Sequence, residues 1–100
     1  MTTETKTALE FMQGHADGAV AGKMAEIMGD LTQDAMQGLM PFMGSLPNPA
    51  TGNKVVAVSQ NGDDYIFDVT YTGDGGKAGT MRETVRQVDG VWKIVAIAAP

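Results

Sequence analysis

The sequence predicts an α+β domain in which N-terminal helices pack on one face of a four-stranded antiparallel sheet. Residues 5–43 carry alanine, methionine and leucine at three- and four-residue spacing, which is typical of helices with one buried face. Residues 54–98 alternate valine, threonine and aromatic residues with polar ones, which is typical of strands. Residues 44–53 contain two prolines and two glycines and therefore read as the connector. With 100 residues in all, we expect one domain spanning residues 1–100.

We expect three helices, at residues 5–15, 19–28 and 32–40. The segments His15–Gly18 and Gly29–Asp30 resemble turns or caps and would separate them. Thr32 is suited to cap the third helix, because its hydroxyl can accept a hydrogen bond from the first turn. Pro41 would weaken or kink the end of that helix.

Glycines and methionines recur through the helical half. The spacing of Gly14, Gly18 and Gly22 would indicate helix dimerisation in a membrane, but the segment is too polar, so we expect bends, ends or close packing. Six of the eight methionines fall between Met12 and Met43. They would form either an adaptable binding surface or, as we favour, part of the core.

Four strands follow, at residues 54–60, 64–72, 79–88 and 91–98. Their short connectors make each neighbouring pair antiparallel. The last connector is Asp89–Gly90, the strongest short-range signal for a hairpin, because both residues tolerate positive φ.

Pairing outward from Asp89–Gly90 sets the two faces of the sheet, with Val85 opposite Ile94 and Glu83 opposite Ala96. The expected inner face of the last two strands carries Met81, Glu83, Val85, Gln87, Trp92, Ile94, Ala96 and Ala98. The second strand adds Tyr65, Phe67, Val69 and Tyr71 beneath the helices. The expected outer face carries Arg82, Thr84, Arg86, Val88, Val91, Lys93, Val95 and Ile97. Because half of this outer face is apolar, we expect a homodimer through it.

Three short helices with Phe11 in the first, followed by a meander ending in Asp-Gly-Val-Trp-Lys-Ile-Val at residues 89–95, resemble the cystatin-like, nuclear transport factor 2-like superfamily. The resemblance is closest to its small bacterial members of unknown function; it is loose over most of the chain and close over residues 89–95. It implies a curved sheet that wraps a helix as a cone with a ligand site at the mouth. Members include noncatalytic modules and isomerase-like, dehydratase-like and polyketide cyclase-like enzymes. With four strands this chain is short for the pattern, which indicates a shallow pocket.

Few polar residues are placed to serve such a pocket. Glu83 falls on the core face, where desolvation would raise its pKa and suit it to general acid or base chemistry; alternatively it lies at the rim or bonds a tyrosine. His15, the sole histidine, lies near Asp17 and would pair with a carboxylate for proton transfer, or simply benefit from the helix dipole. These two residues are the catalytic candidates.

The expected ligand-binding residues are Tyr65, Tyr71, Glu83 and Trp92. A tyrosine hydroxyl can donate a hydrogen bond to a ligand oxygen, as in ketosteroid isomerase-like pockets. The alternative is that both tyrosines are core aromatics with hydroxyls at the rim.

Several classes of partner are disfavoured. A net charge of −5 argues against nucleic acid, whose phosphates require a basic surface. The absence of cysteine and the single histidine give no convergent metal ligands, and Gly73–Lys77 lacks the spacing of a phosphate loop, so no metal or cofactor is predicted. Without a long apolar run or a signal-peptide pattern, we expect no membrane association and a cytoplasmic location unless a leader has been removed.

The sequence therefore predicts a noncatalytic domain that binds a small apolar or amphipathic molecule, or a second copy of itself. The alternative is an isomerase-like, dehydratase-like or polyketide cyclase-like enzyme that uses Glu83, His15 and a tyrosine around an apolar cavity. A pocket holding Glu83 close to His15 or a tyrosine favours the enzyme, and a filled interior favours the noncatalytic module.

Overall fold

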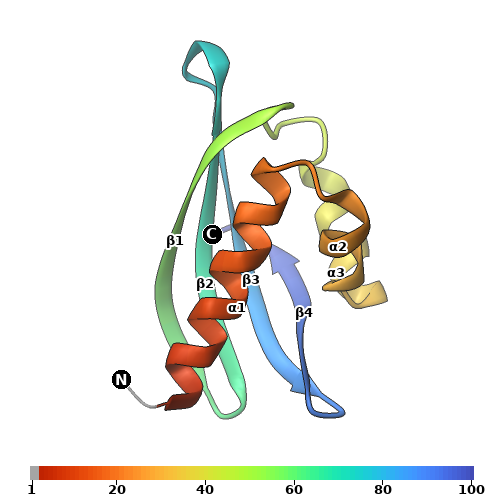
Figure 1. The fold of residues 1–100 in the computed structure, drawn as a ribbon, viewed down its shortest axis with the longest axis vertical. Coiled ribbons are helices and arrows are strands. Elements are labelled where there is room, and N and C mark those ends of the chain that lie inside the picture. Colours follow the sequence, from red (N-terminus) through yellow and green to blue (C-terminus); the bar gives the residue numbers. More distant parts are fainter. Residues whose placement is uncertain (1–2) are drawn as a thin grey trace.

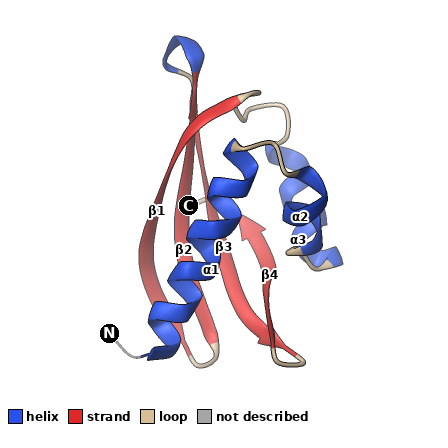
Figure 2. Ribbon diagram, in the orientation of Figure 1, coloured by secondary structure: helices blue, strands red, loops and turns tan. Residues whose placement is uncertain are grey.

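A four-stranded antiparallel sheet with three helices on one face forms the framework of the protein (Figures 1 and 2). The computed structural model describes residues 3–100, with side chains from Thr7 onward. The helices are α1 (Thr3–Val20), α2 (Met24–Gly29), α3 (Gln33–Leu39) and the short 3-10 helix η1 (Met40–Phe42). The strands are β1 (Ala50–Asn61), β2 (Asp64–Gly73), β3 (Ala78–Val88) and β4 (Val91–Ala98), with the 3-10 turn η2 (Asp74–Gly76) after β2. The strands lie side by side in sequence order, which confirms the predicted α+β meander.

The helical layer has two parts. Figure 1 shows α1 lying across the sheet, while α2 and α3 sit together on the side of β4. Strict alternation on β2 sends its aromatic and valine side chains toward α1, as predicted. The buried core consists of Ala8, Met12, Ala16, Ala35, Tyr65, Phe67, Val69, Tyr71, Met81, Val85, Ile94 and Ile97.

The first helix is longer than the sequence suggested. The predicted break at residues 15–18 is wrong, since α1 runs unbroken to Val20. Gly18 does not end the helix but lets α2 approach, because an added Cβ would lie 3.3 Å from Cγ2 of Ile27. The chain turns instead at Gly22, whose φ of +77° belongs to the left-handed region that favours glycine.

The third helix begins and packs as its sequence dictates. Thr32 is its N-cap, and the Thr32 hydroxyl accepts a hydrogen bond of 3.2 Å from the backbone N–H of Ala35, which confirms the predicted cap. At Gly38 an added Cβ would overlap the carbonyl oxygen of Ile97, so α3 rests directly on the backbone of β4.

A β-bulge changes the register of the last hairpin. The predicted pairs hold from Val88–Val91 to Val85–Ile94, but Val95 is an extra residue, so that Thr84 pairs with Ala96 and Glu83 with Ile97. Beyond the bulge the predicted faces are wrong: Ile97 enters the core, and Ala96 and Ala98 are exposed. At the other end of the sheet, β1 starts at Ala50, inside the predicted connector.

The outer face of the sheet is crossed by polar pairs. The guanidinium of Arg82 donates two hydrogen bonds to Asp68, at 2.9 and 3.1 Å, and Arg86 pairs with Asp64 in the same way. The bulge removes Ile97 from this face and brings Ala96 and Ala98 onto it. The homodimer through this face remains a prediction.

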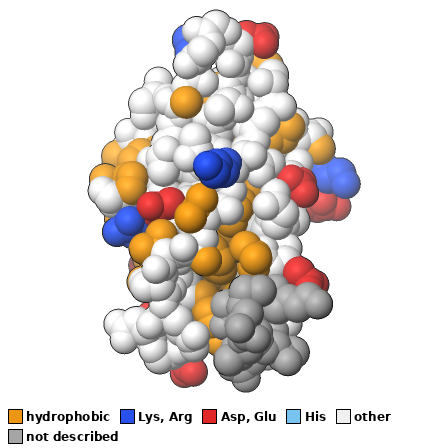
Figure 3. Space-filling model, turned by 90° about the vertical axis from the view of Figure 1, so that its left-hand side faces the viewer, with side chains coloured by type: hydrophobic (Ala, Val, Ile, Leu, Met, Phe, Trp, Pro, Cys, Tyr) orange, Lys and Arg blue, Asp and Glu red, His pale blue; other side chains and the backbone are white. Residues whose placement is uncertain are grey.

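The two edges of the sheet differ. At the β4 edge, the N–H of Ile94 donates to the carbonyl of Asp30 (2.8 Å), and the N–H of Thr32 donates to the carbonyl of Ile94 (3.0 Å), so the α2–α3 link forms a parallel bridge to β4. Within the described part of the chain, β1 pairs with β2 alone. Figure 3 looks onto the side of the molecule that carries β1 and shows apolar side chains along the middle of that face. Val56 and Val58 of β1 are both exposed.

Candidate functional site

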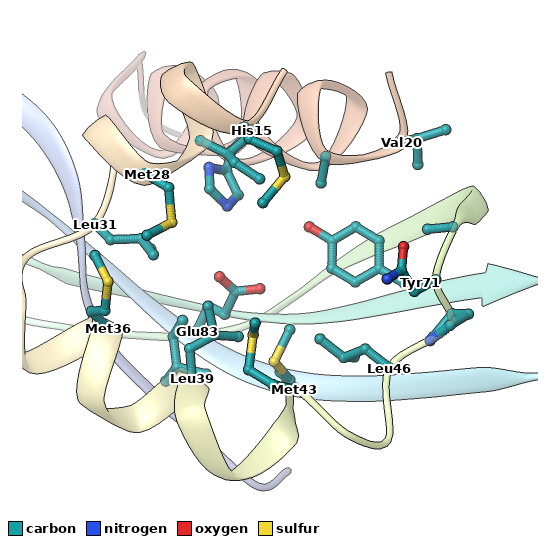
Figure 4. A pocket seen from close by; sticks show the side chains of 18 of the residues that line it. His15, Val20, Met28, Leu31, Met36, Leu39, Met43, Leu46, Tyr71 and Glu83 are labelled. Atoms are coloured by element: carbon teal, nitrogen blue, oxygen red, sulfur yellow. The ribbon is translucent and has the colours of Figure 1, made fainter. Parts of the chain in front are cut away.

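A cavity of about 450 Å³ lies between the short helices and the inner face of the sheet (Figure 4). Its walls come from the end of α1, from α2, α3, η1 and residues 43–50, and from the inner side chains of β2, β3 and β4. Most of the lining side chains are aliphatic or thioether groups. A volume of this size falls within the range of small-molecule sites in proteins.

Methionine is the dominant lining residue. Six of the eight methionines border the cavity: Met24, Met28, Met36, Met40, Met43 and Met81. The expectation that the methionines fill the core holds for Met12 of α1 and for Met81 of β3, which are both buried in the core. The unbranched thioether side chain adapts to different shapes, so a wall built from it can adjust to an occupant.

Glu83 is the buried carboxyl group of this cavity. Its strand position between Phe67 and Ile97 surrounds it with apolar neighbours, and only 1% of the residue is exposed. Its Oε2 atom has no hydrogen-bond partner among the described residues. Burial disfavours the ionised form and raises the pKa of the Glu83 carboxyl to about 7. The sequence predicted both this position and the direction of the shift.

His15 faces the same cavity from α1. Its Nδ1 lies 2.8 Å from Oδ2 of Asp30, and the backbone of Asp30 is itself held by Ile94 of β4. The prediction that Asp17 is the partner of His15 is wrong, because Asp17 accepts hydrogen bonds from Gln13 and Asn53 instead. Because α1 continues through this region, residues two apart point to different sides of the helix.

Tyr71 is the third polar group of the cavity. It is buried on β2, and Figure 4 shows its hydroxyl directed into the space between His15 and Glu83. Burial, together with the negative charges of Glu83 and Asp17, raises the pKa of the Tyr71 hydroxyl. Tyr71 therefore stays protonated and can both donate and accept a hydrogen bond.

The other two predicted site residues lie elsewhere. Tyr65 and Trp92 are not among the described residues that line the cavity. Their rings pack edge to face, with centroids 5.6 Å apart and an interplanar angle of 74°. The structure thus brings together Glu83, His15 and Tyr71, and places Tyr65 with Trp92 in a separate part of the interior.

The arrangement suits an apolar occupant with a polar group. None of the described residues that line the cavity is a lysine or arginine. Among residues 3–100 there is no cluster of three or more His, Cys, Asp and Glu side chains that would hold a metal ion. Nor does any helix in that range combine the length and hydropathy needed to cross a membrane.

Sequence reasoning missed Asp30, and it favoured a core role for the methionines over the alternative of an adaptable binding surface. Asp30 was predicted to lie in a turn. Its pairing with His15 depends on the bridge between Leu31 and Ile94 of β4, and Ile94 lies 64 residues after Asp30 in the sequence. The clustering of methionine between Met12 and Met43 was a usable signal, because the thioether side chain is typical of adaptable binding surfaces as well as of cores.

Comparison of the chain with protein-family models, with curated proteins and with solved structures finds no significant match.

Proposed function

We propose that this protein binds a small, predominantly apolar molecule in the cavity between its short helices and the inner face of β2 and β3. The observation that carries the proposal is a cavity of about 450 Å³ with mainly apolar walls and a buried, unpartnered carboxyl group inside it. Ligand sites combine apolar walls with a few convergent polar groups in this way. A molecule that binds this site in the folded protein alone would also stabilise the fold.

The proposal extends to the nuclear transport factor 2-like type of domain. Its support is the order of the elements, three helices followed by a four-stranded meander, and the closing sequence at residues 89–95. In that superfamily ligands bind at the mouth of the cone, and the proposal places the ligand here against the methionine wall.

Binding is tested by the methyl resonances of the methionines, with octanol as a neutral apolar probe. We expect the signals of Met28, Met36 and Met81 to shift in a saturable way, while Met12, which is buried on α1 and is not among the lining residues, serves as an internal control. Leu39→Trp would fill the cavity and suppress the shifts, whereas Val88→Trp on the exposed outer face would not. Equal shifts at Met12 and at the cavity methionines, or none at all, would contradict the proposal.

A second candidate function is proton transfer on an apolar substrate. The observation that favours it is the position of Glu83, whose pKa of about 7 suits a general base, across the cavity from the His15–Asp30 pair. Glu83 would remove a proton from an acidic C–H bond and return it to another atom of the substrate, as in an isomerase-like enzyme.

The generic carbon acid nitrobenzisoxazole tests this second function, because loss of its ring proton opens the ring to a coloured phenolate. We expect the rate to rise as pH increases through about 7, where Glu83 ionises. Glu83→Gln should abolish the reaction and Glu10→Gln, at an exposed position, should not. Equal rates in the two variants would reject Glu83 as the base.

A further inference from the structure

We infer that the ligand of this cavity is an apolar amine whose ammonium group pairs with the carboxylate of Glu83. The inference rests on the proposed function and names the chemical class of the ligand. It is carried by three features of the cavity: a buried acceptor without a partner among the described residues, the absence of lysine and arginine from the described lining, and two further polar groups directed to the same space.

The unpaired acceptor is the strongest of these features. An ionised carboxylate that is 1% exposed and lacks a partner is unfavourable unless a donor or an opposite charge approaches it. None of the described lining side chains is a lysine or arginine that could supply that charge from within the protein. An ammonium group on a ligand supplies both the charge and the hydrogen bonds.

The same lining disfavours an acidic ligand. A carboxylate or phosphate entering the cavity would meet Glu83 with no lysine or arginine among the described lining residues to offset the repulsion, and His15 is already paired with Asp30. The net charge of −5 acts in the same direction, since it attracts cations toward the protein and repels anions.

His15 and Tyr71 provide two more hydrogen-bond acceptors, so that together with Glu83 they can accept all three N–H bonds of an ammonium group. When the neutral ring of His15 donates Nδ1–H to Asp30, its Nε2 carries a lone pair, and Figure 4 shows the ring directed toward Glu83. The oxygen of Tyr71 is the third acceptor, directed into the same space. An alkylammonium has three N–H bonds, one for each of Glu83, His15 and Tyr71, while its chain contacts the methionine wall.

The titratable groups around Glu83 predict how binding depends on pH. These groups are His15 on α1, Asp30 in the α2–α3 link and Tyr71 on β2. Burial raises the pKa of Glu83 to about 7, so the carboxylate that the amine needs is scarce at about pH 5.5 and abundant at about pH 8. An alkylammonium stays charged across this range, as lysine does.

The experiment compares three probes with one chain length: octylamine, octanol and octanoate. Affinities come from calorimetry or from the methyl signals of the cavity methionines at about pH 8. We expect octylamine to bind roughly tenfold more tightly than octanol, with octanoate the weakest, because a buried charge-assisted hydrogen bond is worth about that factor. Glu83→Gln should remove the preference for octylamine and leave octanol within about twofold, whereas the exposed Glu10→Gln should change neither.

The results for the three probes distinguish a failure of the proposed binding function from a failure of the amine inference. If none of the probes, octanol included, perturbs the cavity methionines, the proposed binding function fails. If octanol binds as tightly as octylamine, or octanoate binds best, the amine inference is overturned while the binding function stands.

A measurement on the wild-type protein keeps the inference testable if Glu83→Gln does not fold. The affinity for octylamine should rise several-fold from about pH 5.5 to about pH 8, while that for octanol stays flat. An octylamine affinity that does not change with pH would overturn the role of Glu83.

Discussion

The two ends of the sheet's inner face obey the same alternation of side chains but are covered differently. Near the hairpin turns, Tyr65 and Phe67 are buried under α1, an 18-residue helix (Figure 1), and the half-buried Trp92 packs against Tyr65. Toward the other end, Tyr71 and Glu83 lie under helices of six and seven residues, which place Met24, Met28 and Met36 on the wall of the cavity. The comparison teaches that helix length and side-chain flexibility, rather than the strand pattern, decide where this interior is filled and where it stays open.

The largest expected effect comes from truncating one residue at each end. Phe67→Ala should lower the free energy of unfolding by about 3–5 kcal/mol, because Phe67 is fully packed and the site cannot collapse. Met36→Ala should cost about 1 kcal/mol, since it enlarges a space that already exists. Urea unfolding followed by circular dichroism measures both values. Similar losses for the two variants would show that the two ends are packed alike.

The next prediction concerns the pH dependence of the free energy of unfolding, which involves Glu83 at the cavity end of the sheet. Because the folded state raises the pKa of Glu83 from 4.5 to about 7, the stability linked to its neutral form is complete below the unfolded value and is lost as pH rises through about 7. The wild type should therefore lose about 3 kcal/mol relative to Glu83→Gln between about pH 4 and pH 8. Asp17, Asp64 and Asp68, whose pKa values are lowered by hydrogen bonds, are present in both proteins and cancel. Urea unfolding of both proteins at each pH measures the difference between their free energies of unfolding. A difference that does not change with pH would show that Glu83 is in contact with solvent.

The smallest expected change in stability comes from a substitution on the outer face of the sheet, which belongs to neither end of the interior. Val91 is 55% exposed beside Val88, and Val91→Lys should change the free energy of unfolding by less than about 0.5 kcal/mol. If the homodimer through this face forms, the substitution should convert it to a monomer in light scattering. A mass that is the same in both proteins would reject this interface.

The sequence was sufficient for whatever depends on local pattern. The strand alternation, the Asp89–Gly90 hairpin and the Thr32 cap are local, and together they place Glu83 inside the molecule. The bulge at Val95 was not predictable in this way. With or without one extra residue, the residues after Val95 still alternate between the two faces of the sheet, and only tertiary packing determines whether Ala96 or Ile97 faces the core.

The candidate site was predictable only in part, because it depends on contacts between distant segments. Glu83 and Tyr71 follow from the strands that carry them, but His15 acquires its partner only when the link at residues 30–32 docks on β4. The end of α1 shows the same limit: Gly18 resembles a helix terminator in isolation and becomes a packing position once Ile27 lies against it.

The bridge between residues 30–32 and β4 also determines how this sheet can be extended by another chain. It occupies the N–H and C=O of Ile94, so an incoming peptide strand finds those groups already bonded at that edge. On β1, alternate backbone amides point away from β2, with register irregularities between Ala50 and Gly52 and between Ala57 and Ser59. We therefore expect the amide of Ile94 to exchange slowly with solvent and the outward amides of β1 to exchange faster.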